Sequence, residues 1–162
     1  MRRVIFASSY HVVGMYEASE LPLGPDAPVR PDTLYGVSKV FGETLARFYF
    51  DKFGIECLCI RISTAGNPAT PREARLWCNR DDLAGLVEVA LDAETLGYRV
   101  VYGISDNPRA PLPVESGSNL GWRPAHSSLE LGAPDPREEL DPAEPKHQRL
   151  GGVFALWGHP DD

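Results

Sequence analysis

The sequence predicts an α/β protein with an open, doubly wound parallel sheet, because three apolar strand-like runs alternate with two amphipathic helix-like segments. The 162 residues carry a net charge of −7, with 43% hydrophobic and 24% charged residues, which is typical of a globular chain. Strand, helix, strand, helix, strand is the order of a parallel sheet with helical crossovers.

The first predicted strand is RRVIFASS (residues 2–9), a β-branched and aromatic run that ends in small polar residues. Such a run suits a buried parallel strand whose carboxyl end faces a ligand. Residues 17–32 then contain prolines and a glycine that exclude regular structure, and Asp32 is a suitable N-cap for a following helix.

Residues 33 to about 53 form the first predicted helix, which Gly54 ends. Its apolar residues recur at steps of three and four, and this pattern predicts one stripe that faces the core. The stripe consists of Leu34, Val37, Phe41, Leu45 and Phe48.

The second strand is predicted at IECLCIRI (residues 55–62), where Cys57 and Cys59 alternate on one face and are expected to be buried thiols. A loop, TAGNPATPREAR, follows. Asp81 and Asp82 then precede a helix over residues 83–97, and YRVVYGI (residues 98–104) is the third strand.

The remaining chain is rich in proline and poor in apolar residues, so we expect an irregular tail. Its two apolar segments are SNLGWRP (residues 118–124) and LGGVFALW (residues 150–157), and we expect both to dock on the sheet domain.

Composition excludes several classes of function. An acidic chain without a block of basic residues is not expected to bind nucleic acid, and no apolar run is long enough to cross a membrane. Three cysteines indicate reduced thiols and a cytoplasmic protein. The four histidines lack metal-ligand spacing, so no metal site is predicted.

Tyr35 and Lys39 are one helical turn apart, about 6 Å along the axis, and therefore share a face. A free phenol has a pKa near 10, and its use as a base at pH 7 requires about 4 kcal/mol of preferential stabilisation of the phenolate. A neighbouring ammonium contributes to this. Ser9, at the carboxyl end of the first strand, is positioned to converge on the same site.

The motifs SS, P-x-x-x-Y-G-x-S-K and the long helix resemble the extended short-chain dehydrogenase/reductases, the NAD-dependent epimerase/dehydratase family. Within this family the chain is most similar to uronate dehydrogenases, which oxidise hexuronic acids at C1 with NAD. The similarity is carried by the segments FASSYHVVGMY, RIST, LWCNRDDL and VVYGIS. The resemblance covers about residues 3–124. It implies a Rossmann-like catalytic half over residues 1–124 and an irregular tail over residues 125–162.

The resemblance assigns catalytic roles to three residues. Tyr35 would be the general base that removes the proton of the anomeric hydroxyl while hydride passes to the nicotinamide. Lys39 would favour the phenolate and, with Tyr35, hold the nicotinamide ribose. Ser9 would orient the reacting hydroxyl.

The same resemblance places substrate contacts at Ser9, His11 and Thr64. A uronate carboxylate calls for a bidentate guanidinium. Arg72 is the predicted partner of the carboxylate. When Trp77 is aligned with the family's tryptophan and no gap is introduced, Arg72 falls on the family's arginine. Arg75 is the alternative. In relatives the tyrosine-bearing helix often forms a dimer interface, so a homo-oligomer through this helix is predicted.

Two departures from the family are apparent. Tyr10 stands where close relatives carry a small amide. The glycine-rich turn that would cradle the pyrophosphate of NAD has no counterpart, since the glycines form no fingerprint between a strand and a helix. The first strand is consequently expected to be an exposed edge.

Three hypotheses follow. The first is a truncated, NAD-dependent uronate-dehydrogenase-like oxidoreductase that makes an aldarolactone but is inactive by itself. The second is a fragment of a nucleotide-sugar epimerase or dehydratase, which begins with the same hydride abstraction. The third is a non-catalytic remnant or interaction module. For the first hypothesis, the alternative to truncation is a stable half that pairs with a separate nucleotide-binding chain.

Overall fold

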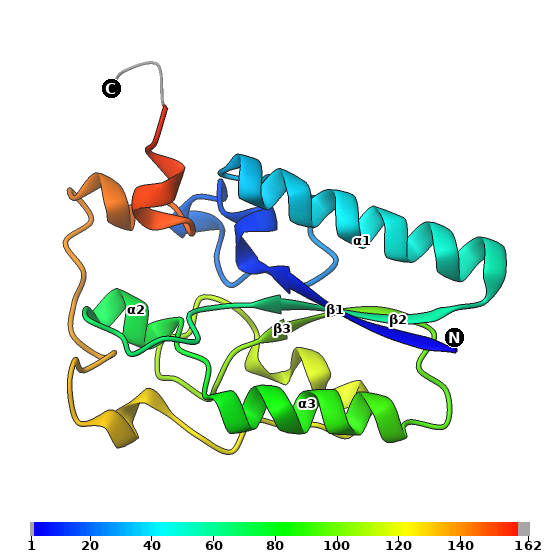
Figure 1. The fold of residues 1–162 in the computed structure, drawn as a ribbon. Helices are drawn as coiled ribbons and strands as arrows, with labels where there is room; N and C mark the ends of the chain where they lie inside the picture. Colours follow the sequence, from blue (N-terminus) through cyan, green and yellow to red (C-terminus); the bar gives the residue numbers. More distant parts are fainter. Residues whose placement is uncertain (1, 159–162) are drawn as a thin grey trace.

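Three parallel strands lie at the centre of the fold, with helices on both faces of the sheet (Figure 1). The structure is a computed structural model that describes residues 2–158. The strands are β1 (Arg3–Ser9), β2 (Glu56–Ile62) and β3 (Tyr98–Gly103), in the order β1-β2-β3. Arg3 pairs with Glu56 and Cys57 with Tyr98, both in parallel register. The predicted α/β class and parallel sheet are confirmed.

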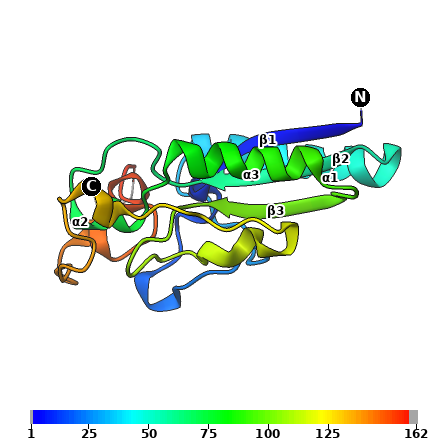
Figure 2. The same ribbon diagram turned by 90° about the horizontal axis from the view of Figure 1, so that it is seen from below.

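Helix α1 (Leu34–Phe53) covers one face of the sheet, and α3 (Arg80–Asp92) covers the other, as both views show (Figures 1 and 2). A short α2 (Pro71–Arg75) lies between β2 and α3, inside the segment that the sequence predicted to be loop. Its N-cap, Thr70, accepts a hydrogen bond from the Glu73 amide, and Pro71 is favourable in the first turn. The helix α3 also starts earlier than predicted, because Asn79 caps it.

Strand β2 is the central strand and is almost wholly buried. Cys57 and Cys59 are buried free thiols, as predicted, and burial raises the pKa of Cys59 to about 12. Strand β1 pairs only with β2 among the described residues, so it forms an edge of the sheet. An apolar groove of about 270 Å³ lies between this strand and α1, lined by Val4, Phe6 and other apolar side chains.

Helix α1 turns a different face to the sheet than its apolar periodicity predicts. The predicted core stripe is exposed, from 43% for Leu45 to 88% for Leu34. The fully buried residues of α1 are Gly36 and Glu43. A period near 3.6 shows that a helix has an apolar face but does not say what covers that face.

The two ends of α1 differ in how well the sequence predicts them. The N-cap prediction is wrong, because Thr33, not Asp32, accepts the hydrogen bond from the Gly36 amide. Gly54, with φ +67°, ends the helix as predicted.

A buried ion pair joins α1 to the sheet. The Arg61 guanidinium on β2 donates two hydrogen bonds to the Glu43 carboxylate, Nε to Oε1 at 3.0 Å and Nη2 to Oε2 at 2.9 Å. Ser8 of β1 donates to Oε1 at 2.6 Å. The side chains of Arg61 and Glu43 are only 3% and 7% exposed. This network therefore fixes α1 against both β1 and β2.

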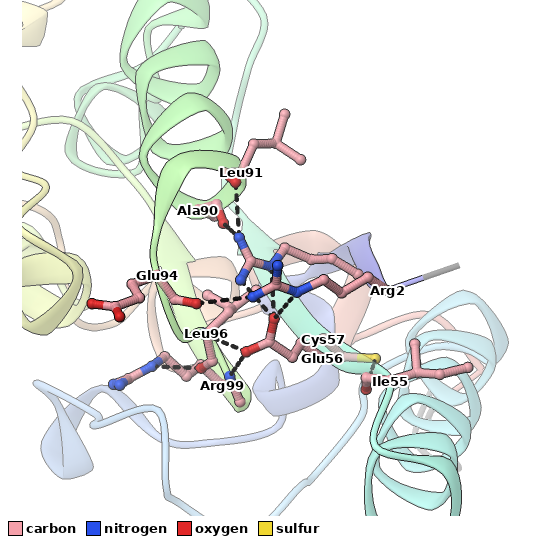
Figure 3. A network of polar contacts seen from close by, with 11 residues as sticks. Arg2, Ile55, Glu56, Cys57, Ala90, Leu91, Glu94, Leu96 and Arg99 are labelled. Carbon is pink, nitrogen blue, oxygen red and sulfur yellow. Dashed lines mark hydrogen bonds and ion pairs between the residues drawn. The ribbon is translucent and has the colours of Figure 1, made fainter.

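A second carboxylate, Glu56, organises the opposite end of the sheet (Figure 3). It accepts hydrogen bonds from the amides of Leu96 and Gly97, just ahead of β3, and from the Arg3 guanidinium of β1. The Gly97 amide, the Arg3 side chain and the Leu96 amide lower the pKa of Glu56 to about 2. Glu56 thus links all three strands at their amino ends.

The segment after β3 contains only short 3₁₀ turns within residues 104–158, at Val114–Leu120, Ser128–Leu131, Pro145–His147 and Gly152–Ala155. Both predicted apolar segments dock. Trp122 packs with Leu86 and the sheet, and Leu150 packs with Tyr10 and Val12 just after β1. None of the helices in residues 2–158 is long and apolar enough to cross a membrane.

Replacing Glu43 by alanine is expected to lower the free energy of unfolding by about 3–5 kcal/mol, because Arg61 would keep a buried charge without its partner. Chemical denaturation followed by circular dichroism measures this. The matched control is Asp51→Ala, which breaks the exposed Arg47–Asp51 pair on the same helix and should cost less than about 0.5 kcal/mol. Equal losses in the two variants would contradict the role of the buried pair.

Candidate active site

The carboxyl end of β1 and the first turns of α1 carry the three residues that the sequence predicts to be catalytic, Ser9, Tyr35 and Lys39. The Lys39 ammonium donates a hydrogen bond to the Ala7 carbonyl at 2.9 Å. It also lies 5.3 Å from the centre of the Tyr35 ring, within the range of a cation–π contact. Lys39 is therefore held between the end of the strand and the tyrosine.

Tyr35 is 53% exposed, and its ring meets the His11 ring edge-on at 6.0 Å. Ser9 is the last residue of β1 and is buried, and its hydroxyl accepts a hydrogen bond from the His11 amide at 3.2 Å. Within residues 2–158, no hydrogen bond joins the Tyr35 hydroxyl to Lys39 or to Ser9. The three residues lie at one edge of the sheet, and the tyrosine is accessible.

His11 is held by a carboxylate whose role sequence reasoning missed. Its Nδ1 lies 2.7 Å from Oδ2 of Asp32, whose side chain is fully buried. Gly14 and Gly151 leave the space that this carboxylate occupies, since a Cβ at either position would lie 1.9 Å from Oδ2. No local sequence pattern predicts the contact between His11 and Asp32. The position of Asp32 just ahead of a helix already suggests a different role, that of N-cap.

The tail closes over this histidine. The Phe154 ring meets the His11 ring edge-on at 5.0 Å. Phe154 and Tyr10 also line a pocket of about 340 Å³ together with Thr64 and Arg72. The pocket thus contains two of the predicted substrate contacts.

Arg72 and Arg75 lie on the same short helix but have different surroundings. Arg72 donates a hydrogen bond to the Leu150 carbonyl. It also lies against Gly152, and a Cβ added to Gly152 would lie 2.7 Å from the Arg72 guanidinium. Burial raises the pKa of the neighbouring Tyr10, although the charge of Arg72 opposes this. Arg75 donates instead to the carbonyls of Pro136 and Glu138 in the tail. Arg72 shares a pocket with Thr64, and Arg75 does not.

Gly36 sets how closely α1 approaches the strand end. A Cβ there would lie 2.5 Å from the His11 carbonyl oxygen. Glycine therefore lets the helix that carries Tyr35 and Lys39 pack directly on the turn that follows β1.

The residues predicted to contact the ribose of a dinucleotide, Tyr35 and Lys39, lie near the carboxyl end of β1. The close-packed glycines serve other purposes, since Gly36 accommodates a backbone carbonyl and Gly42 accommodates the Phe6 ring. Within residues 2–158, no glycine-rich turn between a strand and a helix offers amides to a pyrophosphate. No group of three His, Cys, Asp or Glu residues in that range could hold a metal ion.

A parallel α/β sheet with a Tyr-x-x-x-Lys helix beside its carboxyl edge defines a class of protein, and comparison with known sequences agrees. The NAD dependent epimerase/dehydratase family matches residues 1–93. The chain belongs to this family.

Curated relatives are more specific. The chain is 43% identical to the uronate dehydrogenase of Agrobacterium fabrum over 147 residues, covering 85% of this chain and 55% of that protein. It is 44% identical to the uronate dehydrogenase of Pseudomonas syringae over 161 residues, covering 98% and 58%. The chain therefore spans little more than half the length of these relatives.

A solved structure shows the same fold. A mutant uronate dehydrogenase from Agrobacterium tumefaciens complexed with NAD superposes with a TM-score of 0.84 at 39% identity. The match covers 95% of this chain and 59% of that one.

Gly36→Ala is expected to lower the free energy of unfolding by about 1–3 kcal/mol, because the added methyl group overlaps a backbone carbonyl that cannot move freely. The control is Gly85→Ala in the middle of α3, where the nearest atom to a new Cβ is the Trp122 Nε1 at 3.7 Å. That change should instead stabilise the protein by about 0.5–1 kcal/mol. Thermal unfolding of both variants measures the two effects, and a stabilised Gly36→Ala protein would show that the close approach is wrong.

Proposed function

We propose that this chain carries the catalytic half of an NAD-dependent dehydrogenase that oxidises a hexuronate at C1 to an aldarolactone. The observation that carries the proposal is its high identity to uronate dehydrogenases across the segment that contains Tyr35, Lys39 and Arg72. The geometry supports it, because Tyr35 and Lys39 lie at the carboxyl end of β1, where open α/β sheets bind ligands.

Tyr35 is the proposed general base. Its exposed ring is accessible to a sugar, and its hydroxyl has no partner within residues 2–158 that would block proton transfer from the anomeric hydroxyl. NAD, when bound, supplies the acceptor for the hydride that leaves C1. The Lys39 ammonium, 5.3 Å from the centre of the phenol ring, places a positive charge beside the tyrosine.

Ser9 and His11 orient the substrate in this proposal. The Asp32 carboxylate fixes the His11 ring through Nδ1, which leaves Nε2 for a sugar hydroxyl. Asp32 is a positioning residue, since it acts through the histidine.

Arg72 is the proposed partner of the uronate carboxylate. It lies in the same pocket as Thr64, and a planar guanidinium matches a carboxylate in two parallel hydrogen bonds. Arg75 is less suitable, because its guanidinium is engaged with two tail carbonyls.

The chain alone is not expected to turn over, because its described residues offer no pyrophosphate cradle. The three buried free thiols support a reducing, cytoplasmic setting. The experiment therefore uses the chain as given and a chimera, in which the nucleotide-binding part of the Agrobacterium fabrum relative is joined ahead of residue 1. NADH formation with glucuronate and galacturonate is measured by absorbance.

We expect activity in the chimera only, and a loss of about 10²- to 10⁴-fold in kcat on Tyr35→Phe, because the general base is removed. The control is Tyr49→Phe, which removes a hydroxyl from the exposed side of the same helix and should leave kcat unchanged. A Tyr35→Phe chimera with unreduced kcat would contradict the proposed base.

Self-association through α1 stays a prediction, now with a defined surface: the exposed stripe of Leu34, Val37, Phe41, Leu45 and Phe48. Sedimentation velocity should show a dimer that Phe41→Glu dissociates, because a charge would have to be buried. Ala84→Glu on the exposed side of α3 is the matched control. A monomeric unmodified chain at high concentration would contradict the prediction.

A further inference from the structure

A basic pocket shares Arg72 and His147 with the pocket that holds Thr64. It has a volume of about 290 Å³ and is lined by Arg72, Arg75, Arg109, Arg149 and His147, with no aspartate or glutamate among its lining residues. Four of the 16 lysine and arginine side chains thus gather at one pocket of a chain whose net charge is −7.

The positive charge of this pocket is poorly compensated. Arg149 makes no side-chain hydrogen bond or ion pair with any residue in the described range. The partners of Arg72 and Arg75 are backbone carbonyls, which occupy some N–H groups without cancelling the charge. Arg109 pairs with Glu139, but that carboxylate is 84% exposed and does not line the pocket.

The positive charge of Arg109 acts on Arg75, and the negative charge of Glu139 opposes this effect. Burial lowers the pKa of Arg75, and the positive charge of Arg109 lowers it further. Like charges repel, and an anion bound in the pocket would offset this repulsion.

Four separate segments build the pocket, which makes it a product of the fold. Arg72 and Arg75 come from α2, Arg109 from the loop after β3, and Arg149 from the tail. A fourth segment contributes Leu21, and the apolar lining residues also include Leu76, Leu140 and Leu150. A lining that combines cationic and apolar side chains suits a small organic anion better than a bare halide.

We propose that this pocket is a second ligand site that binds a small polyanion with two or more carboxylate or phosphate groups. Arg72 and His147 line both this pocket and the one that holds Thr64, so an occupant here competes with the candidate active site for Arg72. The proposal does not depend on the proposed oxidation, because it requires neither NAD nor a hexuronate.

Isothermal titration calorimetry of the chain as given tests the proposal, with pyrophosphate as the phosphate probe and citrate as the carboxylate probe. We expect one-to-one binding that weakens with ionic strength, and the tighter probe identifies the chemistry of the ligand. Arg109→Gln and Arg149→Gln should each weaken binding about tenfold, as the loss of a charge-assisted hydrogen bond does.

The matched control is Arg123→Gln, which removes the same charge from an exposed position outside the pocket and should leave the affinity unchanged. Circular dichroism checks that each variant is folded. Absence of heat with both probes would overturn the proposal. So would equal weakening in Arg123→Gln and Arg149→Gln, because binding would then follow net charge alone.

The arginine Nε–Hε signals in NMR spectra locate the site independently. On addition of the tighter probe, the Arg72 and Arg149 signals should shift at low occupancy, and that of Arg123 should not. Uniform shifts across all arginines would show diffuse association and refute a defined pocket.

Discussion

The buried pair between Glu43 and Arg61 is the constraint on which the site depends. It joins the middle of α1 to the central strand, and Ser8 extends the same network to β1. A hydrogen-bonded ion pair out of water is costly to break, since either partner alone would remain a buried charge. Helix α1 is therefore fixed in rotation, and this rotation sends Lys39 toward the Ala7 carbonyl.

The same rotation explains why α1 is apolar on its outer side. A helix tied to its sheet by a glycine and an ion pair leaves its large apolar residues facing away. One of these residues, Leu45, lines the apolar groove beside β1. Exposed apolar surface of this kind is where association would bury area.

The irregular tail supplies contacts that the strand and helix alternation alone would not provide. Phe154 covers His11, the Leu150 carbonyl receives Arg72, and tail carbonyls receive Arg75. Arg72 thereby lines two pockets, and Arg75 lines one of them. A proline-rich segment without regular structure can do this because it follows the surface of the domain and presents backbone carbonyls to it.

The sequence by itself determined the order of the three strands and the two long helices, the carboxyl ends of β2 and α1, the burial of two cysteines and the pairing of Tyr35 with Lys39. All of these follow from local spacing, which sets the period of a strand or helix and the neighbours within one turn. Tertiary structure decided which face of α1 is inside, the partner of Asp32 and the separate surroundings of Arg72 and Arg75. Those outcomes depend on contacts between residues far apart in the chain, such as Glu43 with Arg61, and no local pattern specifies which distant group will neutralise a buried charge.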